Sequence, residues 1–399
     1  MRYLLSNAIR ADRIPQFKDV SAVFGRAHYS WKINANLYRR GLNAVRLLKD
    51  IEAPDIYQDP IAKRVAGIEE TDVHLADKPI EALRPLFGNK NVAIEVWEFP
   101  ELSTQDYTGD PRNNQVAMLR KFDCVWCGSS FTAKNMQLHG ISAIHLPPPV
   151  AEFVDTKTAS LSGIPVIRLD TTNYQNTNYE DLADIISANK NIYLCILAPY
   201  DKRKNFKNLI QGFLSSEASK NSILIVKLVL DNVVTTVGNI NEILAVHYEL
   251  EAVSANVVFV GAYLAAEQMT TLYRSCSFFV SAASAEGLNL PLIEAMTHGR
   301  PVIAPDNTAM RDYITADHAI VMGFEEAEAV GPIHALHEYM TTTHFPPSHF
   351  QVRAAFTAAS KMPKAQAESI GKRGSAFVKQ FFGLKEFESR LGTFERDFL

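Results

Sequence analysis

Residues 190–330 show a regular alternation of two apolar patterns. Short continuous apolar runs predict buried strands, and they lie at residues 192–198, 223–230, 257–260, 278–281, 302–304 and 319–322. Between these runs, apolar residues recur at helical spacing, as in Phe206, Leu209, Ile210 and Phe213. Parallel strands that are covered by helices on both faces need such continuous apolar runs. The pattern therefore predicts a doubly wound α/β domain, in which ligands bind at the carboxyl ends of the strands.

The chain before residue 150 shows a less regular version of the same alternation. Short apolar runs lie at residues 3–5, 20–24, 92–96, 124–127 and 143–146, and apolar spacing predicts a helix over Lys32–Lys49. Three prolines at 147–149 then stiffen the chain, and residues 151–190 are polar and irregular. We therefore expect an N-terminal domain over residues 1–155 and a second domain over residues 156–375, with terminal helices at 377–382 and 384–399.

Composition excludes several classes of protein. The chain is 47% hydrophobic and 21% charged, which is typical of a soluble globular protein. A formal net charge of −4 argues against binding to nucleic acid. No apolar run is long enough to span a membrane, and the start is too polar for a signal peptide. With only four cysteines, these features predict a cytoplasmic protein.

Positive charge is concentrated near the N-terminus. Residues 1–50 contain ten Lys or Arg residues and three Asp residues. This region is consistent with peripheral contact with the inner face of a membrane or with a phosphorylated acceptor. The solvated face of an ordinary surface helix is the favoured interpretation, and both stay open.

Two segments of the second domain carry candidate chemistry. Arg203 and Lys204 follow the first predicted strand and precede its helix, a position that favours an anion such as a diphosphate. Glu286 follows the fourth strand, and Glu294 lies about one turn into the helix that begins near Pro291. Carboxylates accept paired hydrogen bonds from vicinal hydroxyls, so sugar and ribose are candidate partners.

These segments resemble a known family. The stretch EGLNLPLIEAMTHGRPVIAP, with Glu286 and Glu294 eight residues apart, resembles the donor-site signature of the retaining GT-B glycosyltransferases of family 4, also called glycosyl transferases group 1. Arg203-Lys204-Asn205 resembles the R-K-N form of that family's diphosphate-binding segment. The resemblance is clear over roughly residues 190–325.

The resemblance implies a GT-B fold, with two Rossmann-like doubly wound domains facing a cleft and a C-terminal helix, residues 376–399, that crosses back to the N-terminal domain. It places Arg203 and Lys204 on the diphosphate of a nucleotide-sugar and adds backbone N–H groups from Leu288, Asn289 and Leu290. Glu294 would hold the ribose, and Glu286 would hold the hydroxyls of the sugar. Asn289 stands where the family commonly has a second glycine, and Asn tolerates unusual backbone angles better than most residues.

The implied reaction transfers a sugar to a hydroxyl of a glycan or lipid-linked glycan with retention of configuration. Same-face attack is favoured over a covalent intermediate on Glu286, because the family role of that residue is sugar recognition. The sequence contains no D-x-D triplet, and Arg203 and Lys204 can replace a divalent ion at the phosphates. We therefore expect no metal and no cofactor beyond the donor substrate.

The acceptor side is less defined. Val96-Trp97-Glu98-Phe99 resembles a W-E element of some bacterial members, and residues 24–30 resemble the loop before the first long helix. That loop lacks the double glycine common in relatives. The acceptor candidates on these segments are Gly25, His28, Ser30, Trp97 and Glu98. For His28 and Glu98 a structural role is favoured over contact with the acceptor, and for Trp97 a core position is favoured over a sugar platform.

Other interpretations remain. A degenerate GT-B protein would bind nucleotide-sugar or glycan without turnover, whereas a nicotinamide-dependent oxidoreductase would need a G-x-G-x-x-G motif, which is absent. Cys124 and Cys127 form a C-x-x-C motif, for which burial in a strand is favoured over redox or zinc chemistry. His298 is expected to lie at the C-terminal end of the helix that carries Glu294, next to Gly299.

Overall fold

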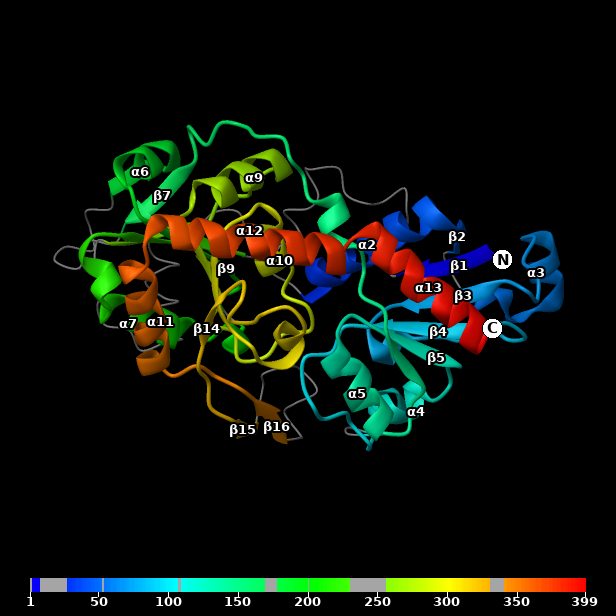
Figure 1. Cartoon of the computed structure of the whole chain (residues 1–399). Helices are drawn as coiled ribbons and strands as arrows, with labels where there is room; N and C mark the ends of the chain where they lie inside the picture. Colours follow the sequence, from blue (N-terminus) through cyan, green and yellow to red (C-terminus); the bar gives the residue numbers. More distant parts are fainter. Residues whose placement is uncertain are drawn as a thin grey trace.

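The computed structural model describes residues 2–7, 27–51, 54–106, 109–168, 178–199, 201–229, 256–330 and 341–399. Two parallel-rich sheets lie side by side, each with its own helices (Figure 1). The predicted pair of doubly wound α/β units is therefore confirmed. The division at residues 155 and 156 stays a prediction, although one sheet ends at residue 145 and the other begins at residue 165.

The N-terminal sheet is wholly parallel, with strand order β2-β1-β3-β4-β5-β6. Its strands are β1 Arg2–Asn7, β2 Leu47–Ile51, β3 Val73–Asp77, β4 Lys90–Glu95, β5 Cys124–Cys127 and β6 Ala143–His145. Its helices are α2 Ala27–Val45, α3 Pro60–Val65, α4 Gln115–Leu119 and α5 Ser130–Leu138. The apolar run predicted at residues 20–24 lies outside the described residues.

The helix predicted over Lys32–Lys49 ends earlier than expected. Helix α2 stops at Val45, and Leu47 and Leu48 pair with Arg2 and Tyr3 of β1. Pairing with a distant strand satisfies the backbone of this segment, so tertiary context overrides the helical spacing of Leu48.

The C-terminal sheet has strand order β14-β13-β12-β9-β10-β11-β7-β8, in which β7 runs antiparallel to its two neighbours and the other described pairs are parallel. Its strands are β7 Pro165–Arg168, β8 Asn178–Asp181, β9 Ile192–Leu197, β10 Ile223–Leu228, β11 Val257–Val260, β12 Phe278–Val280, β13 Val302–Pro305 and β14 Ile320–Met322. A small antiparallel pair joins β15 Ala327–Val330 to β16 Thr341–His344. The six predicted apolar runs are all strands.

Residues 151–190 are more regular than the sequence predicted. They contribute β7, β8 and the helix α6 Leu182–Ala188, which begins at an Asp181 N-cap that accepts from the N–H of Ala183. Strands β7 and β8 are short and lie at one end of the sheet, with β8 as the edge strand, and so they lack the long apolar runs that identify central strands.

Helices cover both faces of the C-terminal sheet and then return to the first sheet. They are α7 Phe206–Leu214, α9 Ala266–Ser275, α10 Leu290–Thr297, α11 His349–Lys361, α12 Lys364–Phe381 and α13 Leu384–Phe398. Helix α12 packs against α10, whereas Phe387, Leu391 and Phe394 of α13 are buried with Tyr3 and Trp126 of the N-terminal sheet (Figure 1). The last helix therefore contributes to the core of the first half of the molecule.

Candidate functional site

The first predicted segment is a tight turn between β9 and α7. The 3₁₀ turn η8, Lys202–Lys204, begins at an Asp201 N-cap that accepts from the N–H of Arg203, and Asn205 takes a left-handed conformation (φ 53°) before α7 starts. Burial opposes ionisation of Asp201, but the charges of Arg203 and Lys204 outweigh it and lower the pKa of this carboxyl. The turn therefore presents two cations beside one ionised carboxylate.

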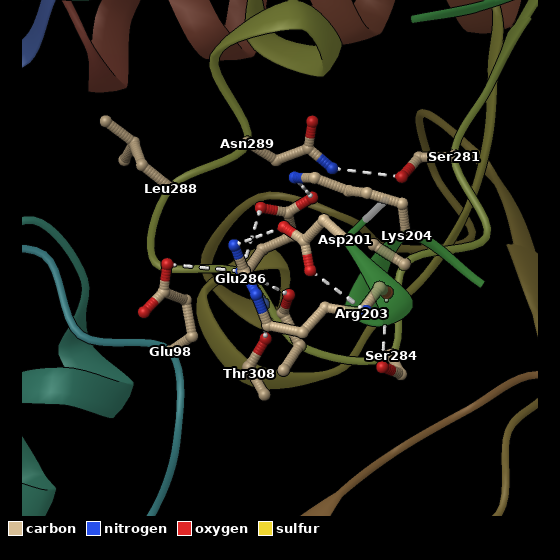
Figure 2. Close-up of polar contacts among 12 residues, drawn as sticks. Glu98, Asp201, Arg203, Lys204, Ser281, Ser284, Glu286, Leu288, Asn289 and Thr308 are labelled. Carbon is tan, nitrogen blue, oxygen red and sulfur yellow. Dashed lines mark hydrogen bonds and ion pairs between the residues drawn. The ribbon is translucent and has the colours of Figure 1, made fainter. Parts of the chain in front are cut away.

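Arg203 is held by groups from both halves of the molecule. Its Nη2 contacts Asp201 Oδ2 at 2.7 Å, and its Nη1 contacts Glu98 Oε1 at 3.1 Å and donates to the carbonyl of Ala285 at 3.1 Å (Figure 2). Burial works against the cation, but the charges of Asp201, Glu98 and Glu286 raise the pKa of Arg203. The guanidinium is therefore a permanent positive charge at the contact between the two halves.

Lys204 and Glu286 form the centre of the site. Lys204 Nζ lies 2.7 Å from Glu286 Oε1 (Figure 2). The Glu286 N–H donates to Thr308 Oγ1 at 2.9 Å, and the Ser284 N–H donates to the carbonyl of Arg203 at 2.7 Å. These bonds tie the β9–α7 turn to the loop after β12, so the cations and the carboxylate are positioned together.

The loop after Glu286 restricts which residues fit at two positions, Gly287 through a close contact and Asn289 through a left-handed backbone. A Cβ on Gly287 would lie 2.4 Å from Val96 Cγ1, so a side chain there would collide with the N-terminal half. Asn289 has φ 62° and ψ 63°, and its Nδ2 donates to Ser281 Oγ at 3.0 Å (Figure 2). Among the described residues, the backbone N–H groups of Leu288, Asn289 and Leu290 have no hydrogen-bond acceptor. They precede or begin α10, where free N–H groups favour an anion.

Glu294 lies one turn into α10 beside an aromatic pair. The Tyr273 hydroxyl donates to Glu294 Oε2 at 2.7 Å, and the Tyr273 ring stacks on His298 with 5.5 Å between centroids. Burial raises the pKa of Glu294, and the Tyr273 hydrogen bond partly offsets this rise. Burial and neighbouring cations lower the pKa of His298 to about 4, so this ring is neutral at pH 7.

One cavity of about 740 Å³ connects these groups. Its C-terminal wall includes the donor candidates Arg203, Lys204, Glu286, Leu288, Asn289, Leu290 and Glu294. Its N-terminal wall includes Ile33, Asn34, Arg40, Val96 and Glu98. The structure therefore places all seven donor candidates on one cavity between the two sheets, while their individual roles stay predictions.

The acceptor candidates are placed less uniformly. Glu98 lines the cavity and contacts Arg203. Trp97 instead lies in the N-terminal core against Phe99, with its indole N–H donating to the carbonyl of Glu101 at 2.8 Å, and it does not line the cavity. Gly25 lies outside the described residues, and the side chains of His28 and Ser30, at the start of α2, are also outside them.

Sequence reasoning missed four residues of the site. Asp201 precedes Arg203 by two residues and Tyr273 lies between the third and fourth predicted strands, but neither carried an assigned role. Asn34 lies far along the chain from the donor segments, and Thr308 follows the donor stretch by three residues. The position of Asp201, two residues before Arg203, was a usable signal for an N-cap of the turn and an ion pair with Arg203. Asn34 had none, because only folding brings it to the site, whereas closeness to the donor stretch was a usable signal for Thr308.

The C-x-x-C cysteines are buried in β5. Cys124, Cys127, Cys195 and Cys276 are all free thiols, and burial raises the pKa of Cys124 to about 11. Within the described ranges, no three His, Cys, Asp or Glu side chains are arranged to hold a metal. The absence of a metal requirement stays a prediction.

A family model described as "Glycosyl transferases group 1" matches residues 191–333. This stretch is a glycosyl transferases group 1 domain. The group 1 domain begins one residue before β9 and contains both donor segments, the η8 turn and the Glu286 loop. No significant match to a curated protein was found.

Solved structures confirm the GT-B fold around the group 1 domain. Sucrose-phosphate synthase from Thermosynechococcus elongatus has a TM-score of 0.60 at 13% identity, over 99% of this chain and 98% of that one. The alpha,alpha-trehalose-phosphate synthase (UDP-forming) from Burkholderia vietnamiensis has a TM-score of 0.56 at 12% identity, over 99% and 98%. Alr3699/HepE from Anabaena, in complex with UDP and glucose, has a TM-score of 0.55 at 12% identity, over 98% of both chains. At this identity the likeness shows the fold alone.

Proposed function

We propose that this protein is a retaining glycosyltransferase that moves a sugar from a nucleotide-diphosphate sugar to a hydroxyl of a glycan or lipid-linked glycan. The observation that supports the proposal most is the shared cavity. There Arg203 and Lys204, Glu286 and Glu294, and three backbone N–H groups that have no acceptor among the described residues meet within a group 1 domain. This set suits three of the four parts of a nucleotide-sugar, namely the diphosphate, the ribose and the sugar, and leaves the base unassigned.

The two cations would bind the diphosphate. Arg203 and Lys204 contact carboxylates in the structure, and a bound diphosphate would compete for the same two side chains. Both cations would then stabilise the charge that grows on the leaving diphosphate as the anomeric bond breaks. The N–H groups of Leu288, Asn289 and Leu290 would add neutral donors to the same oxygens.

The two carboxylates would bind the hydroxyl-bearing ends of the donor. Glu294, which accepts from Tyr273, would also accept from the ribose hydroxyls. Glu286, which contacts Lys204, would accept from the sugar hydroxyls next to the diphosphate. The acceptor hydroxyl would attack from the face that the diphosphate leaves, and the departing phosphate would take its proton.

Metal independence is part of the proposal. Arg203 and Lys204 supply the positive charge that a divalent ion supplies at other phosphate sites. We therefore expect donor consumption to be unchanged by EDTA. A loss of activity in EDTA that magnesium restores would contradict this expectation.

The first experiment screens UDP-, GDP- and ADP-sugars by thermal shift and then measures their slow hydrolysis without acceptor. UDP-sugars come first because one structural neighbour is a complex with UDP and another is UDP-forming. A transferase binds one donor and hydrolyses it, whereas a degenerate binding protein binds it without turnover. A protein that binds no nucleoside diphosphate would contradict both interpretations.

Substitutions then separate the two carboxylates. We expect Glu286→Gln to lower the turnover rate by about 100-fold or more, because it weakens a contact to the reacting sugar, while affinity for the bare nucleoside diphosphate does not fall, because the charge that competes for Lys204 is removed. Glu294→Ala should instead weaken nucleotide binding itself. Glu368→Gln on the exposed face of α12 is the matched control. Near-normal turnover in Glu286→Gln would refute the role given to this residue.

A further inference from the structure

Asn34 is a buried amide without a hydrogen-bond partner. It lies on α2, its exposed fraction is 4%, and neither Nδ2 nor Oδ1 has a partner among the residues that the structure describes. The neighbouring apolar residues Ile33 and Leu37 pack against the core of the C-terminal half. These two residues therefore hold helix α2 against the C-terminal half.

An amide in this state lowers the stability of the fold. Folding removes Nδ2 and Oδ1 from water and returns no hydrogen bond, and leucine, of nearly the same shape, would avoid that loss. Asn91 shows the ordinary case, because its buried side chain bonds Leu86, Asn89 and His74. A buried polar group without such partners is expected where a ligand supplies them.

The position of Asn34 indicates which ligand. Asn34 lines the cavity from the N-terminal wall, together with Val96 and Glu98. The residues proposed to bind the donor all lie on the C-terminal wall. Glu98 reaches Arg203 across the cavity, so the N-terminal wall borders the diphosphate end of the donor. The space beside this wall is therefore where an attacking hydroxyl would enter.

We propose that Asn34 binds hydroxyl groups of a sugar acceptor, donating from Nδ2 and accepting at Oδ1. A carboxamide carries a donor and an acceptor side by side, which suits two neighbouring hydroxyls of a polyol. This inference rests on the proposed function and adds to it a specificity-determining residue and a substrate class, a saccharide with vicinal hydroxyls.

The test compares Asn34→Leu with wild type in three measurements. The stability of the free protein in urea should stay the same or rise in Asn34→Leu. Hydrolysis of a UDP-sugar without acceptor should stay within twofold. The kcat/KM for transfer to the best acceptor from a panel of free mono- and disaccharides should fall at least tenfold.

Asn91→Leu is the matched control for stability, since it removes a fully bonded buried amide and should lower the urea midpoint. A fall of similar size in Asn34→Leu would assign Asn34 a structural role and overturn the inference. An equal loss of hydrolysis and transfer would place Asn34 on the donor and also overturn it. The inference would also be overturned if the wild-type protein hydrolyses the donor and no saccharide of the panel accelerates donor consumption.

Failure of the proposed function gives a different result. If the wild-type protein neither binds nucleoside diphosphates nor consumes any nucleotide-sugar, the proposed donor site itself is wrong. The stability comparison between Asn34→Leu and Asn91→Leu would still report whether the Asn34 amide lacks a structural partner.

Discussion

Asn289 shows how one residue satisfies both the backbone and the side-chain needs of the donor loop. Its φ of 62° lies in the left-handed region, and its Nδ2 donates to Ser281 Oγ. Glycine would relieve the backbone but would supply no side-chain bond. Asparagine tolerates the left-handed region and adds the bond, which explains how the loop keeps its shape without the second glycine.

A pair of substitutions at this position separates the two contributions. Asn289→Gly loses the side-chain bond, whereas Asn289→Ala loses the bond and also carries a left-handed β-carbon. We expect Asn289→Ala to be less stable than Asn289→Gly by about 1 kcal/mol. Urea unfolding of both variants measures this difference. Equal destabilisation would mean that the backbone angle contributes nothing.

Asp77 is a second residue with a testable effect, because its burial makes the stability of the fold depend on pH. It ends β3 with an exposed fraction of 2%, and its carboxyl oxygens have no partner within the described ranges. Burial raises the pKa of Asp77 to about 8. Between about pH 4 and pH 8 the folded protein keeps a proton that the unfolded chain has lost, so stability falls as pH rises.

Asp77→Asn removes this ionisation at nearly constant shape. We expect the variant to match wild type near pH 4 and to exceed it in the free energy of unfolding by a few kcal/mol at pH 8. Urea midpoints at several pH values between 4 and 8 provide the measurement. Parallel pH profiles for the two proteins would show that Asp77 ionises freely in the fold.

At the scale of elements, local pattern predicted some boundaries and missed others. Helix α10 begins at Leu290 and ends at Thr297, with Gly299 beyond it at φ 75°, close to the predicted limits. Its boundaries are set by Pro291 and Gly299, which act locally. The end of α2 depends instead on the pairing of β2 with β1, which no spacing within α2 encodes.

Helix α13 is an element whose partners lie at the other end of the chain. Leu391 is fully buried in the N-terminal core, near Trp126. We expect Leu391→Ala to lower the free energy of unfolding by about 2–5 kcal/mol, the usual cost of a large-to-small change in a core. The exposed residue Lys385 on the same helix provides the control, Lys385→Ala. Similar unfolding midpoints for both variants would contradict the packing.

At the scale of the whole molecule, one ion pair joins the two walls of the cavity. Glu98 from the N-terminal half contacts Arg203 from the C-terminal half at 3.1 Å. A bound diphosphate would approach the same guanidinium and would be repelled by the Glu98 carboxylate. Donor binding and the contact between the halves are therefore expected to oppose each other.

Glu98→Gln tests this opposition. Removal of the negative charge should strengthen binding of a nucleoside diphosphate by about tenfold, or about 1.4 kcal/mol. Glu101→Gln is the control, because Glu101 accepts from Thr343 and does not contact Arg203. Calorimetric titration of both variants provides the measurement. Weaker binding in Glu98→Gln would show that Glu98 supports the donor site.

The sequence by itself determined the alternating strands and helices of residues 190–330 and the donor segments around Arg203 and Glu286. These features depend on residues close together in the chain, where period, capping and turn chemistry act directly. The tertiary structure alone decided that β2 is a strand, that Asn34 reaches the site, and that Glu98 contacts Arg203. Those outcomes depend on contacts between residues far apart in the chain, and such contacts leave no trace in local spacing.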